Sequence, residues 1–337
     1  MITEWHFCAP NSWRSESGAV MGALSAFQGV DGIFDFWGMP DSDSGNTDPE
    51  PGTRGMGTFD TLNDPISLFS SRILNFFFLR RDVKEAGKTM ALQIPETIWK
   101  RPYARSYKIW KESRNAVPPE ALQRLGLFCR IGIRISDATG EADSFPADSA
   151  ARLADAARKD PDLFLKKAGF PTSGIRTSCT GELSFQPENN LFRVVTPKSE
   201  ALIQQGKTNQ GAALRLEENS TFSTVFAGSL DNRNLTESCR ILLLHLTDVK
   251  PSNGRFTRYG TRLRVHAKGS YPYLLRTGSV RVGLKNSAKG RIRLFALDSS
   301  GKRREEIPFA EQNGHISFVL RNDRGEFAPL AYELIRE

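Results

Sequence analysis

The first forty residues constrain the fold most, because they change from a strand pattern to a helix pattern and back. A short strand pattern covers Ile2-Thr3-Glu4-Trp5, and a second, apolar strand pattern covers 32–37. Between them, a polar loop leads into a helix-like stripe of apolar residues spaced three and four apart: Val20, Ala23, Leu24 and Phe27. This order of elements predicts a parallel βαβ unit.

Two parallel strands are too few for a stable fold, since a two-stranded parallel sheet leaves its edges unpaired and its apolar faces unburied. A (β/α)8 barrel needs eight such strands, and the sequence offers two. We therefore expect the last two βα units of a barrel, either from a truncated reading frame or as the C-terminal piece of a split one. In a barrel, a carboxylate at the C-terminal end of a strand lies on the catalytic face, and Glu4 has that position.

Five short motifs support this placement when they are read together and in order. They are Thr3-Glu4-Trp5, Pro10-Asn11-x-x-Arg14-x-Glu16, Gln28-x-x-Asp31-Gly32-Ile33, Asn63-Asp64-Pro65 and Phe78-Leu79-Arg80-Arg81-Asp82-Val83. The set resembles the last quarter of a bacterial retaining glycoside hydrolase of the (β/α)8-barrel clan that contains β-galactosidases, cellulases and β-agarases. The resemblance implies that Glu4 is the nucleophile on the seventh strand and that a β-sandwich follows the barrel. It also implies an acid/base glutamate on a fourth strand, which this sequence does not contain.

Retaining hydrolysis of polysaccharides or oligosaccharides needs two carboxyl groups about 5–5.5 Å apart, so a chain with one of them is expected to be inactive alone. Asn11 and Arg14 follow Glu4 on a loop, where they could donate hydrogen bonds to its ionised carboxylate or bind substrate hydroxyls. Trp5 and Trp37 end adjacent predicted strands and could form a platform under the apolar face of a sugar. The resemblance matches Trp37 with an aromatic residue at the end of the eighth strand.

Asp31 and Asp35 are alternative carboxylates to Glu4. Asp35 lies near the end of its strand and is a weaker second candidate, whereas Asp31 lies at the start of the strand and is read as structural. Glu4 itself could instead be a salt-bridged residue at a strand end. An acidic loop over 39–61 is either a wall of the substrate cleft or a solvated loop.

No metal ion or other cofactor is expected. The aspartates of the acidic loop suggest calcium, but their spacing does not match an EF-hand, since Gly45 comes one position early and no closing glutamate follows. The four cysteines and four histidines show no metal-ligand spacing, and the cysteines are read as buried or incidental thiols.

Beyond the first units, the sequence predicts a closing helix and then mostly strands. Asp64-Pro65 marks the start of a helix with a heavy apolar face. Strand patterns cover 90–94 and 125–135, and 149–167 is expected to be a helical surface insertion. Short alternating runs then recur at 182–185, 191–196, 212–216, 221–229, 240–247, 263–267, 279–284, 291–297, 315–320 and 331–335. Such spacing is typical of an antiparallel β-sandwich.

The predicted fold class is thus α/β plus all-β, in three ranges. Residues 1–86 form the C-terminal part of a barrel, 87–174 form junction strands with the helical insertion, and 175–337 form the sandwich. Three functions fit this organisation: the C-terminal portion of a glycoside hydrolase, a non-catalytic carbohydrate-binding or scaffold protein, and a self-contained α+β protein in which 1–82 pack as a layer on the sandwich.

Charge is divided unevenly along the chain. Residues 1–82 hold 5 Lys/Arg and 11 Asp/Glu, whereas the remainder holds 41 and 27. The basic part is interpreted as a solvated face, with contact to an anionic polysaccharide as the weaker alternative. Nucleic acid is not an expected partner, because the basic residues alternate along strands rather than clustering in an arm.

No apolar run reaches about 18 residues, so no membrane span is expected. The expected partners are a carbohydrate substrate and the N-terminal barrel portion; periplasmic or extracellular location would follow if that portion carries a signal peptide.

Overall fold

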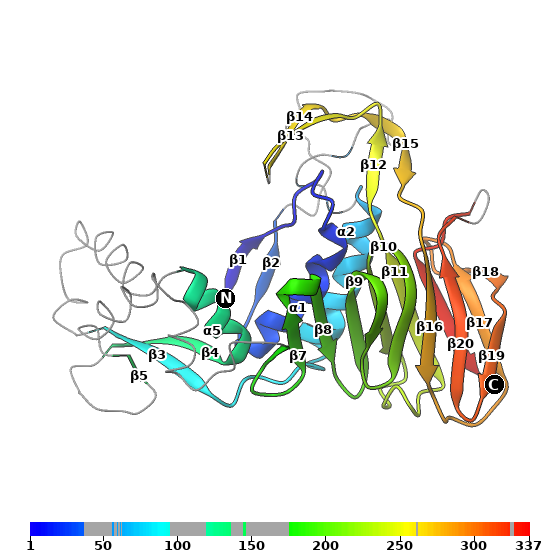
Figure 1. Ribbon diagram of the computed structural model, residues 1–337, viewed down its shortest axis with the longest axis horizontal. Coiled ribbons are helices and arrows are strands. Elements are labelled where there is room, and N and C mark those ends of the chain that lie inside the picture. Colours follow the sequence, from blue (N-terminus) through cyan, green and yellow to red (C-terminus); the bar gives the residue numbers. More distant parts are fainter. Residues whose placement is uncertain are drawn as a thin grey trace. The chain divides into compact units, whose positions relative to one another are not determined.

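The protein is rich in antiparallel β-sheet, with few helices (Figure 1). The computed structural model describes residues 1–36, 56, 59, 61, 63–94, 119–135, 144–145, 175–260, 262–323 and 327–337. These form two compact units. The first comprises Met1–Ser25, Val30–Val83 and Pro187–Glu337, and the second comprises Ala26–Gly29 and Lys84–Gln186. Most of the first and third predicted ranges therefore belongs to a single unit.

The predicted strand–loop–helix–strand order at the start of the chain is confirmed. β1 (Ile2–Trp5) pairs in parallel with β2 (Ile33–Asp35), and the short helix η1 (Arg14–Glu16) and α1 (Ser17–Phe27) lie between them in sequence. Among the described residues this pair forms a sheet of its own, and no barrel surrounds it.

α2 (Pro65–Leu74) begins as the sequence predicts. The Asp64 carboxylate accepts a hydrogen bond of 3.1 Å from the backbone N–H of Ile66, and proline occupies the first turn, where its missing N–H costs nothing. The helix continues into the π-helical turn η3 (Asn75–Leu79), as Figure 1 shows for the light-blue segment. Its apolar face is buried through Ile66, Ile73 and Phe77.

Two glycines let α1 lie close against α2. A Cβ on Gly18 would lie 1.8 Å from the carbonyl oxygen of Ser70, and one on Gly22 would lie 2.8 Å from the Cα of Leu74. The Gly18 N–H instead donates to the Ser70 hydroxyl at 2.7 Å. Replacement by alanine at either position would therefore push the helices apart.

One antiparallel sheet carries most of the first unit. Its strands lie side by side in this order: β8 (Leu191–Val195), β9 (Ser199–Gln210), β10 (Leu214–Ser229), β11 (Arg240–Leu246), β21 (Ala331–Arg336), β17 (Ile292–Leu297) and β18 (Arg303–Glu306). A second arm leaves β10 through β16 (Ser279–Lys285), β20 (His315–Arg321) and β19 (Phe309–Gln312). The predicted antiparallel strands are thus present, within a sheet that has two arms.

β10 belongs to both arms because its register breaks midway. Residues 214–217 pair with β16, and 224–229 pair with β11. The break lies between Asn219 and Ser223, next to Glu218, whose φ of 53° is left-handed. A backbone bend of this kind redirects a strand and lets one strand join two faces of a core.

The two arms enclose one hydrophobic core. Leu216 from the first half of β10 and Val225 from the second half belong to the same buried cluster as Val282, Leu294 and Tyr332. On the other face of the sheet, the ring of Phe226 receives Phe76 and Phe77 edge-on at 5.0 and 5.8 Å. The helices of the first 83 residues therefore form a layer on the sheet, as in the α+β arrangement that the sequence left open.

Two further hairpin-like pairs extend from the first unit. β12 (Val249–Ser252) pairs with β15 (Ser270–Leu275), and β13 (Arg255–Tyr259) pairs with β14 (Arg262–Ala267), both antiparallel. Figure 1 shows β13 and β14, in yellow, projecting beyond the sheet.

The second unit contains a small parallel sheet. β3 (Thr89–Ile94) lies between β4 (Arg130–Ile135) and β5 (Ser144–Phe145), and β6 (Arg176–Thr177) pairs with β7 (Leu183–Gln186). The prediction of strand over 125–135 is wrong in its first part, because α5 (Pro119–Phe128) occupies it. Gln28 fixes that helix end, since its side-chain amide donates to the carbonyls of Gly126 and Cys129, each at 2.8 Å. The predicted helix at 149–167 lies outside the described residues.

Candidate functional site

The ends of the two parallel strands bring a histidine and a carboxylate together. His6 directly follows β1, and its Nδ1 lies 3.3 Å from Oδ1 of Asp35, the last residue of β2. The Thr61 hydroxyl donates to the other Asp35 oxygen at 3.3 Å. The His6 side chain is 5% exposed, and its Nε2 has no hydrogen-bond partner among the described residues. From the sequence, Asp35 is only the second candidate carboxylate, and no pattern singles out His6.

A hollow of about 750 Å³ opens beside this cluster. One wall is the segment that follows β1, and the other is the β13–β14 hairpin. The residues that line it are His6, Phe7, Cys8, Ala9, Pro10, Asn11, Ser12, Trp13, Arg258, Arg262, Leu263 and Val265. Ligands of open α/β sheets bind outside the carboxyl ends of parallel strands, which is where this hollow lies.

Thiol chemistry is disfavoured in this hollow. Burial raises the pKa of the Cys8 thiol above its usual value, which keeps it protonated at neutral pH. The hollow is better suited to binding through its aromatic and cationic side chains.

Glu4 lies on β1 and is exposed. No described residue forms an ion pair with it, so the alternative of a salt-bridged strand-end residue finds no partner there. Glu4 does not line the hollow, which begins two residues later at His6.

Of the two predicted platform residues, only Trp5 is described. It is half-buried and lies edge-on to Phe7, with ring centroids 6.4 Å apart. Trp37 lies outside the described residues. A platform made by both indoles stays a prediction.

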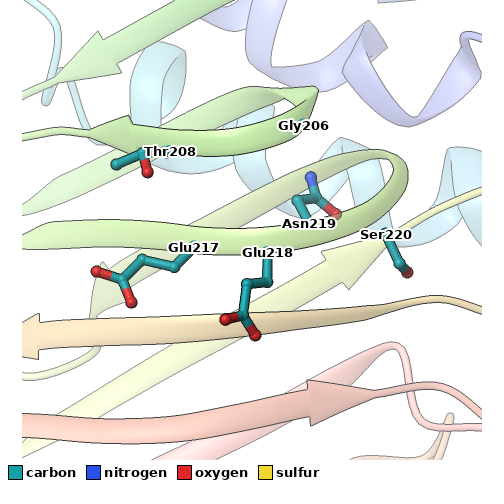
Figure 2. Close-up of a pocket in the computed structure, with 6 residues that line it drawn as sticks. All are labelled: Gly206, Thr208, Glu217, Glu218, Asn219 and Ser220. Carbon is teal, nitrogen blue, oxygen red and sulfur yellow. The ribbon is translucent and has the colours of Figure 1, made fainter.

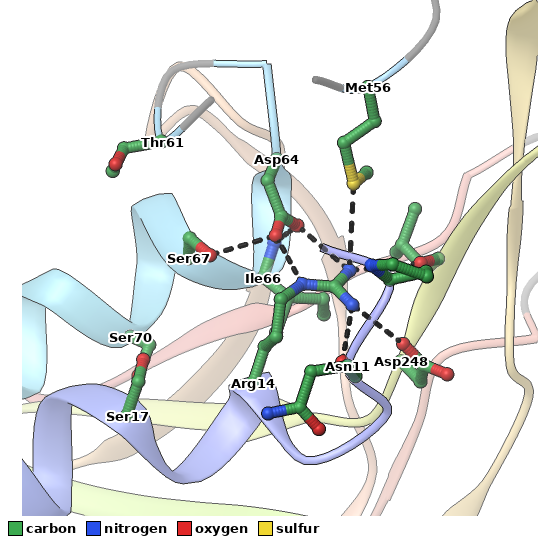
Figure 3. A network of polar contacts seen from close by, with 12 residues as sticks. Asn11, Arg14, Ser17, Met56, Thr61, Asp64, Ile66, Ser67, Ser70 and Asp248 are labelled. Atoms are coloured by element: carbon green, nitrogen blue, oxygen red, sulfur yellow. Dashed lines mark hydrogen bonds and ion pairs between the residues drawn. The ribbon is translucent and has the colours of Figure 1, made fainter. Parts of the chain in front are cut away.

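Asn11 and Arg14 have different places in the structure. Asn11 lines the hollow, and its side-chain oxygen accepts a hydrogen bond of 3.0 Å from the Trp13 N–H. Arg14 is fully buried, and Figure 3 shows its guanidinium between the carboxylates of Asp64 and Asp248. Its Nε and Nη2 donate to the two oxygens of Asp64 at 2.5 and 3.3 Å, and Nη2 also donates to the Val249 carbonyl at 2.9 Å.

The remaining nitrogen of Arg14 completes the network. Nη1 donates to the Asn11 carbonyl at 2.5 Å and lies 3.4 Å from Asp248 Oδ1. A guanidinium engaged in this way has no donor left for a substrate hydroxyl. The structure therefore gives Arg14 a positioning role in place of the predicted contact with substrate: it fixes the loop that carries Asn11.

Lys250 on β12 holds the same loop. Its ammonium donates to the carbonyl of Pro10 and to the Ser12 hydroxyl, and it lies 3.1 Å from Asp248 Oδ2. Burial lowers the pKa of Lys250, although the charge of Asp248 acts in the opposite direction. Asp248 thus contacts both Arg14 and Lys250, which together anchor one wall of the hollow to β12 and the segment before it.

A second hollow, of about 490 Å³, lies where β9 and β10 bend. Figure 2 shows the carboxylates of Glu217 and Glu218 beside it. Each is already paired with an arginine: Glu217 with Arg215 at 2.7 Å, and Glu218 with Arg281 at 3.3 Å. We do not assign a catalytic carboxylate pair to this place, because these ion pairs explain both side chains.

Comparisons with protein-family models, with curated proteins and with solved structures give no match to this chain. Among the described residues, no helix combines the length and apolar character that crossing a membrane requires.

Proposed function

We propose that this chain is the C-terminal portion of a retaining glycoside hydrolase of the (β/α)8-barrel type, with Glu4 as its nucleophile. The exposure of the two parallel strands carries this proposal. Thr3, Glu4 and Asp35 are exposed, and the apolar Met1 and Phe34 are 73% and 57% exposed. Parallel strands in α/β proteins are normally covered on both faces, and among the described residues no further strand pairs with the edges of this sheet. Packing into a barrel would cover these faces and pair these edges.

The chemistry proposed for Glu4 follows the double-displacement route. Its carboxylate attacks the anomeric carbon and forms a glycosyl ester, while an acid/base glutamate from the barrel portion protonates the departing oxygen. Water activated by the same acid/base residue then hydrolyses the ester. Asp35 lies at the end of the neighbouring strand, where its contact with His6 orients the imidazole beside the hollow.

The test is to express the chain joined to the segment encoded in frame before Met1 and to assay it on a panel of nitrophenyl glycosides. We expect turnover by the joined protein and none by this chain alone. Glu4→Gln should lower kcat by about a thousandfold or more, because the nucleophile cannot be replaced by an amide. Asp31→Asn, an exposed carboxylate at the other end of the βαβ unit, is the matched control and should keep the wild-type rate. A Glu4→Gln variant with normal kcat would refute the assignment.

A non-catalytic carbohydrate-binding protein is the second candidate, and one observation favours it. Tyr271 and Tyr273 on β15 stack with centroids 4.1 Å apart, and Tyr271 is 45% exposed. An exposed aromatic ring can cover the apolar face of a sugar. Glycan binding by this chain that is lost in Tyr271→Ala and unchanged in Glu4→Gln would support this candidate over the hydrolase.

A further inference from the structure

The β13–β14 hairpin is cationic in a way that the proposed reaction does not explain. Residues 255–268 contain Arg255, Arg258, Arg262, Arg264 and Lys268, and no aspartate or glutamate. Arg258 and Arg262 are exposed and line the large hollow. No described residue forms an ion pair with either of them. Their charge is therefore available to a ligand in the hollow.

The opposite wall supplies no compensating charge from the part of the chain that the structure describes, since the described lining residues include no aspartate or glutamate. Asp35 already contacts His6 and Thr61, and Asp248 already contacts three cations: Arg14, Lys250 and Arg276. Glu4 is exposed and does not line the hollow. The described lining of the hollow therefore carries a net positive charge, which favours an anion.

Arg258 and Arg262 leave the hairpin on different faces. Arg258 pairs across it with Leu263, and Arg262 pairs with Tyr259, so the two arginines occupy successive positions whose side chains point to opposite faces. Arg258 shares its face with Leu263, and both arginines line the hollow. A guanidinium presents parallel N–H donors that match the oxygens of a carboxylate or sulfate. Apolar surface lies beside them, from Leu263 on the same wall and from the exposed indole of Trp13 on the other.

We propose that this hollow binds an anionic sugar residue, with its carboxylate or sulfate group held by Arg258, its ring against Trp13, and Arg262 adding positive charge at the end of the hairpin. The substrate class of the enzyme is then an acidic polysaccharide. As a statement about substrate, this inference rests on the proposed hydrolase function; as a statement about binding, it is independent of Glu4.

The test measures binding to the full chain by calorimetry at low and physiological salt. The probes are a uronic-acid oligosaccharide, a sulfated galactose oligosaccharide and a neutral cello-oligosaccharide of the same length. We expect one anionic probe to bind at least tenfold more tightly than the neutral one, and which of the two does so identifies the group as carboxylate or sulfate. The double variant Arg258→Gln/Arg262→Gln should lose this preference.

Arg255→Gln/Arg264→Gln is the matched control, because it removes the same two charges from the same hairpin at residues that do not line the hollow. An equal loss in the control would show general charge attraction and overturn the proposal. So would equal affinity for the neutral probe, absence of binding by all three, or equally tight binding of a single-stranded oligonucleotide.

The same measurement on Glu4→Gln separates the two proposals. If Glu4 is not the nucleophile, the Arg258- and Arg262-dependent binding remains while the hydrolase assignment fails. If the joined protein turns over a neutral glycoside in a Glu4-dependent way and the anionic probes do not bind, the hydrolase assignment stands and this inference fails.

Discussion

Replacing Arg14 by methionine is expected to destabilise the first unit by about 4 kcal/mol. The change keeps the approximate length of the side chain and removes its charge, so Asp64 loses its buried cation and Asp248 loses one of its own. Breaking a buried ion pair by removing one partner costs about 3–5 kcal/mol, because the other charge stays in a low-dielectric site. Lys250 still reaches Asp248, which limits the loss there.

Urea unfolding of the full chain, followed by circular dichroism, measures this loss. The midpoint should fall by more than about 1 M, since such transitions have slopes of about 1–3 kcal/mol per molar urea. A second variant, Asp64→Asn, removes the carboxylate charge and keeps a good N-cap residue for α2. The double variant Arg14→Met/Asp64→Asn should lose about 2 kcal/mol less than the two single losses added together, because no buried carboxylate is then left unpaired at position 64.

A loss below about 1 kcal/mol in Arg14→Met would contradict the positioning role. In the joined protein, an unchanged stability with a raised KM would instead restore the contact with substrate that the sequence predicts.

Three further predictions concern buried ionisable groups. Burial lowers the pKa of His245 to about 4, so the free energy of unfolding falls by up to about 3 kcal/mol as the pH falls from 6.5 to 4. In a plot of the urea midpoint against pH, His245→Leu should show a smaller decrease over this range. Burial raises the pKa of Glu16 to about 7, so stability falls as the pH rises from 4.5 to 7, and Glu16→Gln should be more stable than the parent at pH 8 by up to about 3 kcal/mol. The Glu200 carboxylate accepts hydrogen bonds from three backbone N–H groups, those of Ala212, Ala213 and Leu214. Glu200→Ala should therefore lower the free energy of unfolding by about 3 kcal/mol and lower Tm, and Glu200→Gln should lose less. An unchanged Tm in Glu200→Ala would show that water satisfies these N–H groups.

The sequence predicts the regular elements well where the apolar period is strong. The alternation of Val280, Val282 and Leu284 identifies β16, and the Asp64-Pro65 pair identifies the start of α2. β9 was not predicted because its second half is polar, from Gln204 to Gln210; this strand is held by pairing with β10 rather than by its own pattern. β10 was predicted as two strands because the polar residues at 217–220 interrupt its apolar run, at the point where the strand changes arms.

The site is less predictable than the fold because it depends on distant contacts. The burial of Arg14 requires Asp248, which lies 234 positions away, so no local pattern distinguishes it from a loop arginine that faces substrate. The cationic wall of the hollow depends on β13 and β14, and these strands were predicted only in part. A usable signal does exist for His6, since it directly follows a predicted strand whose neighbour ends at Asp35.

The most direct test of the account is to trap the proposed intermediate. A 2-deoxy-2-fluoro glycoside with a good leaving group forms the glycosyl ester but hydrolyses it slowly, because fluorine at C2 destabilises the oxocarbenium-like transition states. After incubation with the joined protein and proteolysis, mass spectrometry should find the added fluorosugar on the peptide that contains Glu4. A label on a different carboxylate, with Glu4 unmodified, would contradict the central claim.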